Sequence, residues 1–321
     1  MNTYNKNDIA QLALRTNFLR DNLEKVLRLV DVLQFLTNNP KLNNRLILKG
    51  GTAINLTVFN MPRLSVDIDL DFHSNCTVEE MLFNRSEINR ELLSYMDSQG
   101  YHQSSDTKNP HSLDSWVFFY QNAAGNRDNI KIEINYSMRQ HVFEPCLRQV
   151  TIDLFTKTDV KTLHPLELFG SKIKALIERH TCRDLYDIFN LLHSELIKDF
   201  NISLLRKIVV FYLTVGGLST PRKKYDFEGI KNISFSQIRA TLLPMLRKGD
   251  KFNYETAKIE VLQFLMELMM LTKSENAFID AFMQKKYLPE LLFNENDIIE
   301  RIRNHPMALW KIRNRETGRT N

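Results

Sequence analysis

The sequence predicts an α+β protein with two lobes: an N-terminal lobe that combines a mixed β-sheet with flanking helices, and an all-helical C-terminal lobe. Apolar and polar residues alternate from Ser65 to Phe72 and again around residue 130, which indicates half-buried strands. From Pro165 onward nearly every segment has helical periodicity, apart from a polar break at Ser219 to Ser234. Because 321 residues exceed what one core usually supports, we expect lobes at 1–160 and 161–321.

The elements of the first lobe follow from periodicity, caps and turn residues. An apolar stripe predicts a helix over 7–38, and RLILK at 45–49 is typical of a short buried strand. Thr77 and Glu80 form a capping box that starts a helix over 77–98. We expect three further strands, the first two joined by a hairpin connection, at 115–121, 129–137 and 150–155.

Composition and charge set limits on the class of protein. Lys and Arg exceed Asp and Glu by 43 to 38, a mild excess that permits a polyanionic partner without requiring one. Cys76, Cys146 and Cys182 lie far apart and lack metal-ligand spacing, which fits a reducing cytoplasm. No signal peptide and no run long enough to span a bilayer is evident, so we expect a cytoplasmic protein.

The strand from Ser65 to Phe72 carries the most informative pattern in the chain. Ser65, Asp67, Asp69 and Asp71 would project from one face and apolar residues from the other. Side chains two apart on a strand lie only ~7 Å from each other, so their like charges repel. A divalent cation relieves this repulsion, and oxygen ligands favour Mg²⁺ or Mn²⁺. The alternative is a solvent-facing strand that merely carries aspartates.

A glycine pair precedes this strand and strengthens the case for a site. Gly50, Gly51 and Thr52 follow the 45–49 strand and lead into a helix predicted over 53–59. Glycines let backbone amides approach an anion closely, and a helix N-terminus adds partial positive charge. A lone glycine pair usually makes only a turn, but beside the aspartates it predicts a site for a nucleoside triphosphate and its metals.

These motifs resemble a known family. GGTA followed by Arg63, Ser65, Asp67 and Asp69 resembles the AbiEii/AbiGii toxin family of nucleotidyltransferases, which shares the core of the polymerase-β-like superfamily. SKIKAL and CRDLYDI, between 165 and 192, resemble the family's downstream motifs, so the resemblance covers roughly residues 40–195. It implies a nucleotidyltransferase fold and a toxin of a type IV-like toxin–antitoxin or abortive-infection system.

The resemblance also implies roles for the motif residues. Asp67 and Asp69 would hold one or two Mg²⁺ (or Mn²⁺) ions for in-line attack on the α-phosphorus of an NTP. Gly50, Gly51, Thr52 and Ser65 would cradle the β- and γ-phosphates, and the contacting hydroxyl is that of Thr52 or that of Ser65. Arg63 would offset the charge of the departing pyrophosphate, or orient the loop by pairing with Asp71.

A further carboxylate, Glu133, alternates with isoleucines in the predicted strand at 129–137. In polymerase-β-like folds, a third acidic residue on a neighbouring strand completes the metal site or activates the attacking hydroxyl. Glu133 is our candidate for this role. The alternative is a solvent-facing glutamate paired with a lysine across the sheet.

Three residues of the second lobe match the downstream motifs. Lys172 lies at the edge of an apolar stripe on the helix at 165–180, so it either delivers its ammonium to triphosphate oxygens or remains a surface lysine. Asp184 and Asp187 share one flank of the next helix, where they contact the nucleotide or position Lys172. An aspartate at the position of Asp184 is common at helix starts, so Asp187 is the better candidate for a direct role.

Only the resemblance implies what accepts the nucleotide. It implies that the acceptor is RNA, in particular the acceptor end of tRNA, and that the modification blocks translation. It also implies a separately encoded antitoxin as partner. Two segments combine basic residues with an aromatic residue, as suits RNA binding, although charge runs are often only solvated faces. They are 221–225, and the C-terminal set Arg301, Arg303, Trp310, Lys311, Arg313, Arg315 and Arg319. The alternatives are modification of a small molecule or protein side chain, or a non-catalytic nucleotide- or RNA-binding protein.

Overall fold

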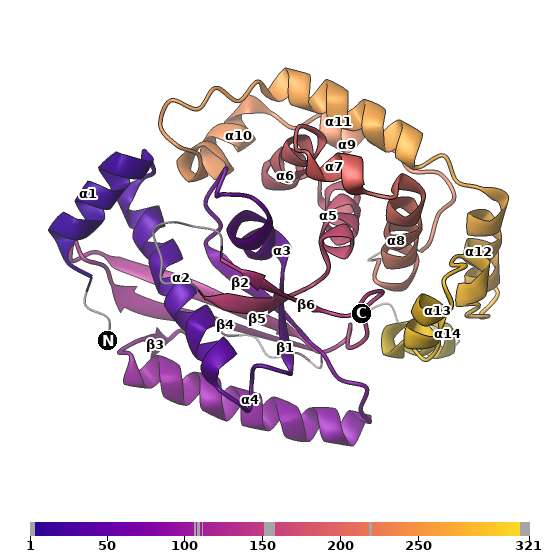
Figure 1. The fold of residues 1–321 in the computed structure, drawn as a ribbon, viewed down its shortest axis with the longest axis horizontal. Coiled ribbons are helices and arrows are strands. Elements are labelled where there is room, and N and C mark those ends of the chain that lie inside the picture. Colours follow the sequence, from indigo (N-terminus) through magenta and orange to yellow (C-terminus); the bar gives the residue numbers. More distant parts are fainter. Residues whose placement is uncertain are drawn as a thin grey trace. The chain divides into compact units, whose positions relative to one another are not determined.

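A computed structural model describes residues 4–105, 107, 110, 112–150, 158–217 and 220–314 (Figure 1). The chain forms two compact units that are not contiguous in sequence. Unit 1 comprises 1–139, 145–163 and 243–250, and unit 2 comprises 140–144, 164–242 and 251–321. A compact unit is not by itself an independently folding domain, so the lobes predicted at 1–160 and 161–321 stay a prediction.

Unit 1 is built on one mixed sheet of seven strands, in the order β3-β4-β5-β2-β1-β7-β6, which confirms the predicted fold class. The central strand β2 pairs antiparallel with β1 and parallel with β5. The elements of the unit are α1 (Lys6–Thr16), α2 (Arg20–Asn38), β1 (Leu46–Lys49), α3 (Gly50–Ala53), the π-helical η1 (Ile54–Val58), β2 (Asp67–Phe72), α4 (Val78–Ser98), β3 (His102–Gln103), β4 (Leu113–Gln121), β5 (Arg127–Asn135), β6 (Cys146–Gln149), β7 (Asp159–Thr162) and the 3-10 turn η2 (Leu243–Met245).

The core of unit 1 lies between one face of the sheet and its helices. Trp116 of β4 and Ile132 of β5 are in register, and both are fully buried. Helix α2 packs against β5 and β7, and crosses the sheet in Figure 1. Phe35 of α2 stacks on Tyr95 of α4, which joins the two helices. Because one face is covered by α2, polar residues of β2 and β5 are left for the opposite face.

The predicted helix at 7–38 is wrong in one respect, since it is two helices. Asn17 adopts a left-handed conformation (φ 60) and ends α1, and α2 begins at Arg20. Asparagine is among the few residues that tolerate this conformation, which breaks the helix between two apolar runs. The Asn17 carbonyl oxygen accepts a hydrogen bond from Lys248 N, because residues 243–250 return to unit 1.

Two other boundaries differ from the predictions. The helix predicted at 53–59 begins instead at Gly50, so the glycine pair forms its first turn. The strand predicted at 150–155 falls mainly on 151–157, which lie outside the described residues, while β6 and β7 flank that segment. The strands at 45–49, 115–121 and 129–137 are confirmed within two residues, as is the 77–98 helix with its Thr77 capping box.

Unit 2 is helical, as predicted from Pro165 onward. Helix α5 packs on α6 and α8, and α8 in turn on α11, α12 and α14. The described part of the segment between α8 and α10 holds only the four-residue α9, in agreement with the predicted polar break. The elements are α5 (Pro165–Arg179), α6 (Cys182–Leu192), α7 (Leu196–Asp199), α8 (Ile202–Val215), α9 (Glu228–Lys231), α10 (Phe235–Thr241), α11 (Tyr254–Leu268), α12 (Lys273–Met283), the 3-10 turn η3 (Pro289–Leu291), α13 (Asn296–Ile302) and α14 (Pro306–Asn314).

Candidate active site

A row of polar residues crosses four strands on the face of the unit 1 sheet opposite α2. Lys49 of β1 is in register with Asp69 of β2, and Asp69 with Glu133 of β5. Glu133 is in register with Ser115 of β4, whose Oγ donates a hydrogen bond of 2.9 Å to Glu133 Oε1. Side chains at paired positions project from the same face, so Asp69 and Glu133 are neighbours. The third carboxylate predicted from sequence therefore lies beside the aspartate strand.

The aspartates of β2 alternate with apolar residues as predicted. Asp67 and Asp69 are half-buried, whereas Ile68 and Leu70 are buried on the other face. At ~7 Å and the effective dielectric of a partly buried site, each pair of like charges costs about 2 kcal/mol. Asp71 differs, because it is buried and its Oδ1 lies 2.5 Å from Lys49 Nζ. The charge of Asp71 is thus compensated by Lys49 within the protein.

The glycine turn lies directly against Asp69. Gly50 has a positive φ of 68, and a Cβ added there would lie only 2.4 Å from Asp69 Oδ2. At Gly51, an added Cβ would lie 2.7 Å from Arg63 Nη2 and 3.0 Å from Ser65 Oγ. A methyl group would therefore force Asp69 to shift at Gly50, where the backbone conformation also favours glycine, and would force Arg63 to shift at Gly51. The turn, the aspartate strand and the loop before it form one tightly packed corner.

Thr52 and Ser65 join the turn to the aspartate strand. Thr52 Oγ1 donates a hydrogen bond to the Asp67 carbonyl oxygen and lies 3.0 Å from Ser65 Oγ. Thr52 is fully buried, and Ser65 is 7% exposed. Because the Thr52 hydroxyl serves the Asp67 backbone, Ser65 is the better placed of the two to contact a phosphate. Which of the two hydroxyl groups contacts a phosphate stays a prediction.

Arg63 is buried under the turn. Its side chain is 1% exposed, and Nη1 donates a hydrogen bond of 2.9 Å to the Leu64 carbonyl oxygen. The backbone of Arg63 forms a β-bridge with Leu246 in the returning segment 243–250. These contacts fit an arginine that orients the loop. The sequence-based alternative of a partner for pyrophosphate stays a prediction.

Lys131 is a residue of the site that sequence reasoning missed. It is in register with Asp67 across the β2–β5 pair, and its Nζ lies 2.8 Å from Glu133 Oε1. Burial acts to lower the pKa of Lys131, but the hydrogen bond to Glu133 and the charges of Glu133, Asp67 and Asp69 together raise it above its usual value. The lysine partner expected for Glu133 thus lies on the same strand and not across the sheet.

The donor set suits a hard divalent cation. Asp67, Asp69 and Glu133 offer oxygens only, as Mg²⁺ and Mn²⁺ prefer, and the Gly50 turn holds one oxygen of Asp69 against the backbone. A positive group, the Lys131 ammonium, already stands among these carboxylates. Across the described ranges, no three acidic, His or Cys side chains are gathered closely enough to hold a metal by themselves. Asp67 and Asp69, with Glu133 beside them, stay the predicted metal ligands.

The three predicted residues of unit 2 form a buried ionic cluster on α5 and α6. Lys172 Nζ lies 3.0 Å from Asp184 Oδ1 and 3.0 Å from Asp187 Oδ2. Lys172 is 6% exposed, and Asp184 and Asp187 are 2% and 1% exposed. Lys172 is therefore not a surface lysine, and the two aspartates hold its ammonium in place. This geometry fits the positioning role that the sequence offered as one alternative.

Further contacts fix Asp184. Arg179 Nη2 lies 2.9 Å from Asp184 Oδ2, and Thr181 Oγ1 donates a hydrogen bond of 2.7 Å to the same oxygen. Burial alone would raise the pKa of Asp184, but the charges of Lys172 and Arg179 lower it to about 2. Asp184 is thus ionised at neutral pH and holds Lys172 as a charged pair.

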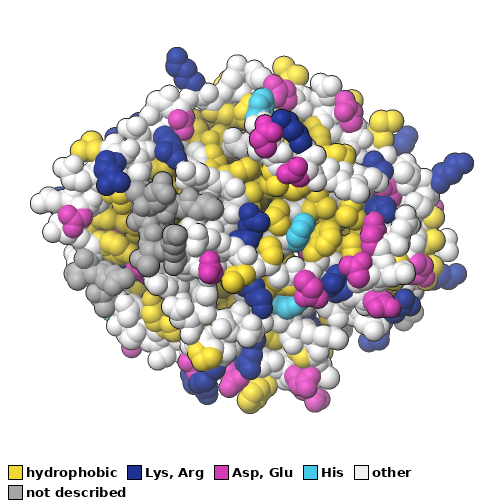
Figure 2. Space-filling view, viewed as in Figure 1, with side chains coloured by type: hydrophobic (Ala, Val, Ile, Leu, Met, Phe, Trp, Pro, Cys, Tyr) yellow, Lys and Arg dark blue, Asp and Glu magenta, His cyan; other side chains and the backbone are white. Residues whose placement is uncertain are grey.

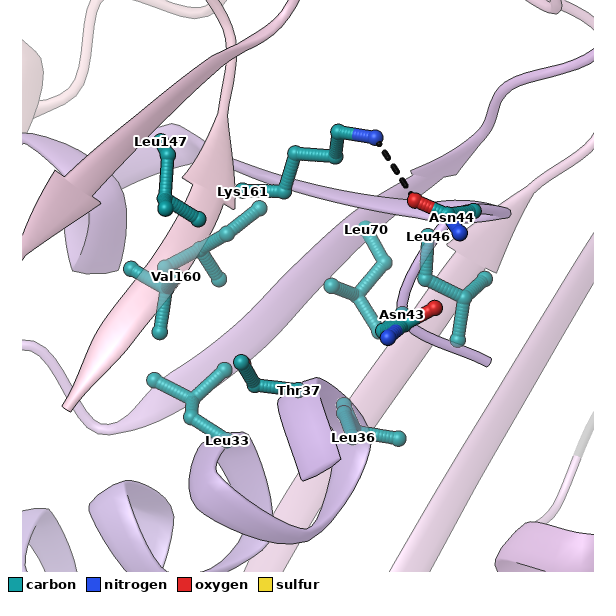
Figure 3. Close-up of a pocket in the computed structure, with 11 residues that line it drawn as sticks. Leu33, Leu36, Thr37, Asn43, Asn44, Leu46, Leu70, Leu147, Val160 and Lys161 are labelled. Carbon is teal, nitrogen blue, oxygen red and sulfur yellow. Dashed lines mark hydrogen bonds between the residues drawn. The ribbon is translucent and has the colours of Figure 1, made fainter. Parts of the chain in front are cut away.

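A cavity of about 120 Å³ lies on the other side of the sheet (Figure 3). Leu33 and Leu36 of α2 face Leu46 and Leu70 across it, and Lys161 donates a hydrogen bond of 3.1 Å to Asn44 at its rim. Leu70 alternates with the aspartates along β2, so this cavity is on the covered face. It is separate from the polar row.

The basic segments proposed from sequence are exposed but partly paired. Lys223 Nζ lies 2.6 Å from Asp280 Oδ1, and Arg301 Nε lies 2.9 Å from Glu144 Oε1. Trp310 is 51% exposed, while Arg315 and Arg319 lie outside the described residues. Figure 2 shows Lys and Arg interspersed with Asp and Glu over the visible face. Their role in RNA binding stays a prediction.

Comparison with known families decides what kind of protein carries this site. The sequence model of the family described as "Nucleotidyl transferase AbiEii toxin, Type IV TA system" matches residues 34–286, most of the chain. The chain belongs to this family. As an AbiEii family member it is a nucleotidyltransferase toxin of a type IV toxin–antitoxin system, and an antitoxin partner is implied. The match spans the glycine turn, the aspartate strand and the Lys172 cluster.

Solved structures agree on the fold. The chain is similar to MenT4, a nucleotidyltransferase toxin from Mycobacterium tuberculosis H37Rv, with a TM-score of 0.64 and 14% sequence identity. The similarity covers 94% of this chain and 99% of MenT4. No match is found among the curated proteins. No helix within the described part of this AbiEii member is both long and apolar enough to cross a bilayer.

Proposed function

We propose that the protein transfers a nucleoside monophosphate from an NTP to RNA, at the acceptor end of tRNA, and thereby blocks translation until its antitoxin restrains it. The reaction forms a bond between an RNA hydroxyl oxygen and the α-phosphorus and releases pyrophosphate. The hydroxyl proton leaves to a base or to solvent. One observation carries the chemistry: the register that sets Asp69 beside Glu133 next to the Gly50 turn.

In this proposal, each residue of unit 1 has a separate task. Asp67 and Asp69 would hold Mg²⁺ or Mn²⁺, which supplies charge neutralisation and activation of the attacking hydroxyl. The backbone of Gly50 and Gly51 would bind the β- and γ-phosphates, because the turn opens helix α3 and a helix N-terminus offers backbone amides to an anion. The Ser65 hydroxyl adds one hydrogen bond to a phosphate oxygen. Thr52 and Arg63 fix the geometry of the turn.

Lys172 would neutralise triphosphate oxygens as pyrophosphate departs. Asp184 and Asp187 keep its ammonium oriented and charged, which supports a role that needs a fixed cation. A lysine held by two carboxylates loses little entropy when it meets a phosphate, because its side chain is already ordered. We therefore assign Asp184 and Asp187 to the positioning of Lys172 in this proposal.

The acceptor is tested by following a label. The protein is incubated with each α-³²P-labelled NTP, Mg²⁺ and total tRNA, and in parallel with tRNA-free cell extract. Label on tRNA, removed by nuclease that trims the 3′ end, is the expected result. Label that appears only on protein or on small molecules would instead support those acceptors and overturn the RNA assignment.

The toxin activity is tested by expression in a bacterial host. Wild type is expected to arrest growth, whereas Asp67→Ala and Asp69→Ala are expected to permit it. Asp159→Ala, an exposed aspartate on β7 of the same sheet, serves as the matched control and is expected to arrest growth like wild type. Equal arrest by all four proteins would remove the catalytic explanation.

A further inference from the structure

Lys131 stands where the proposed reaction needs a divalent cation. Its ammonium is 2.8 Å from Glu133 Oε1, and its position in the sheet is level with Asp67. The carboxylates of Asp67, Asp69 and Glu133 share one face of two adjacent strands with this ammonium. The proposed function gives a task to Asp67 and Asp69 but none to this lysine.

We propose that Lys131 is a positioning residue that acts as a built-in counter-ion, holding the carboxylates of Asp67, Asp69 and Glu133 in place until a divalent cation displaces its ammonium. This inference rests on the proposed function, because it concerns the same metal site. It assigns to the chain itself the charge compensation that the aspartate strand requires before any ligand binds.

The exposure of Lys131 separates it from Lys49, another lysine on the same face of the sheet. Its side chain is 40% exposed and that of Glu133 is 28% exposed, so the ammonium can leave for solvent on its flexible stem. Lys49, by contrast, is 25% exposed and pairs with Asp71, which is 4% exposed. Asp71 is thus held in the protein interior, whereas both partners of the Lys131 pair reach solvent. Of these two pairs, the Lys131 pair is the one that can open.

Displacement has a measurable consequence for metal binding. A divalent cation that enters must break the Lys131–Glu133 pair and overcome the repulsion of a nearby positive charge. Lys131 consequently weakens the binding of the cation alone, while it stabilises the metal-free protein. Removal of the charge reverses both effects: the metal-free protein becomes less stable, and the cation binds more tightly.

The experiment compares the full chain with Lys131→Gln, Lys131→Arg and Lys25→Gln. Mn²⁺ affinity is measured without nucleotide from the electron paramagnetic resonance signal of free Mn²⁺, and melting temperature is measured in chelator and in Mn²⁺. Lys25 is the matched control, because its Nζ lies 2.7 Å from Asp128, an acid of the same strand β5 at the hairpin end. Lys131→Arg keeps the positive charge at the site itself.

Lys131→Gln is expected to bind Mn²⁺ about fivefold more tightly than wild type, which is the scale of one partly exposed ion pair. Its melting temperature is expected to fall in chelator and to rise more than that of wild type on addition of Mn²⁺. Lys131→Arg is expected to resemble wild type. Lys25→Gln is expected to lose stability equally in chelator and in Mn²⁺, with unchanged Mn²⁺ affinity.

Two results would overturn the inference in distinguishable ways. If wild type binds Mn²⁺ and Lys131→Gln binds it equally or more weakly, Lys131 is not a counter-ion that the metal displaces, and the proposed function stands. If wild type binds neither Mn²⁺ nor NTP, the proposed function fails and this inference fails with it.

Discussion

Replacement of Gly50 by alanine probes the contact between the glycine turn and the aspartate strand. The turn has to approach Asp69 so closely that a single methyl group does not fit: the added Cβ would lie 2.4 Å from Asp69 Oδ2 and 3.2 Å from its Cβ. Real Cβ atoms essentially never approach another heavy atom within 3.0 Å, so the carboxylate must retreat by roughly half an ångström or more. We expect Gly50→Ala to fold but to lose activity.

The magnitude has two parts. A positive φ of 68 is strained for alanine and costs about 1–2 kcal/mol of stability, a fall of a few degrees in melting temperature for a chain of this size. Misplacement of the Asp69 carboxylate would disturb the geometry of the proposed metal site, and shifts of this size reduce rates by about 10- to 100-fold. The expected loss of activity is therefore much larger than the loss of stability would explain.

Gly125→Ala is the matched control. Gly125 also has a positive φ, of 89, in the β4–β5 hairpin, but its added Cβ would meet only Gln121 Nε2 at 3.9 Å. Both variants are expected to melt lower than wild type, while only Gly50→Ala loses NTP-dependent labelling of tRNA. Initial rates are measured at matched fractions of folded protein. Equal rates for Gly50→Ala and Gly125→Ala would refute the reasoning, because Asp69 would then tolerate displacement.

Three further predictions concern buried charges. Lys172→Met leaves Asp184 and Asp187 buried without the cation that they share. Urea unfolding is therefore expected to show a free energy of unfolding about 3–5 kcal/mol below that of wild type. A decrease of less than about 1 kcal/mol would contradict this prediction. The pKa of Asp184 is lowered to about 2, so its ionised form stabilises the folded state by roughly 2 kcal/mol above about pH 4. This stabilisation is lost as the pH falls toward about 2. Melting curves of wild type should show this loss between about pH 4 and about pH 2, and those of Asp184→Asn should not. Glu24→Ala removes the carboxylate that pairs with the buried Arg28, whose Nη2 is 2.8 Å from Glu24 Oε1. In the same urea assay this variant is expected to lose about 3–5 kcal/mol of stability. Stability equal to that of wild type would contradict the prediction.

Local patterns made much of the site predictable from sequence. Alternation fixed which residues of β2 share a face, and the Gly50 pair marked the turn before it. The Thr77 capping box located α4 to the residue. These signals depend on neighbours within a few positions, so they can be recognised without knowledge of the tertiary structure.

The position of Lys131 and the burial of Lys172 could not be predicted, because both depend on contacts between segments that are distant in sequence. Lys131 alternates with isoleucines like any half-exposed strand residue, and only the β2–β5 register brings it level with Asp67, which is 64 positions earlier in the chain. Similarly, helical periodicity placed Lys172 at the edge of a stripe, but its burial comes from the packing of α5 on α6. Pairing between distant segments depends on the whole fold, and a single sequence does not encode it locally.

Short elements and backbone conformation account for the remaining differences. Strand β6 has four residues of alternating half-buried and exposed character, too short for its period to stand out. The break at Asn17 interrupts an apolar stripe that continues in the following helix, so periodicity alone joins α1 to α2. A left-handed asparagine resembles any other asparagine in sequence, and its conformation is fixed by the packing around it.

The central claim is that Asp67 and Asp69 bind divalent cations together with an NTP, and titration calorimetry tests it most directly. The account predicts that Mg²⁺ or Mn²⁺ increases the NTP affinity of wild type, and that Asp67→Asn/Asp69→Asn loses this increase while remaining folded. If neither cation changes NTP affinity, and wild type and the double variant bind alike, the account is contradicted.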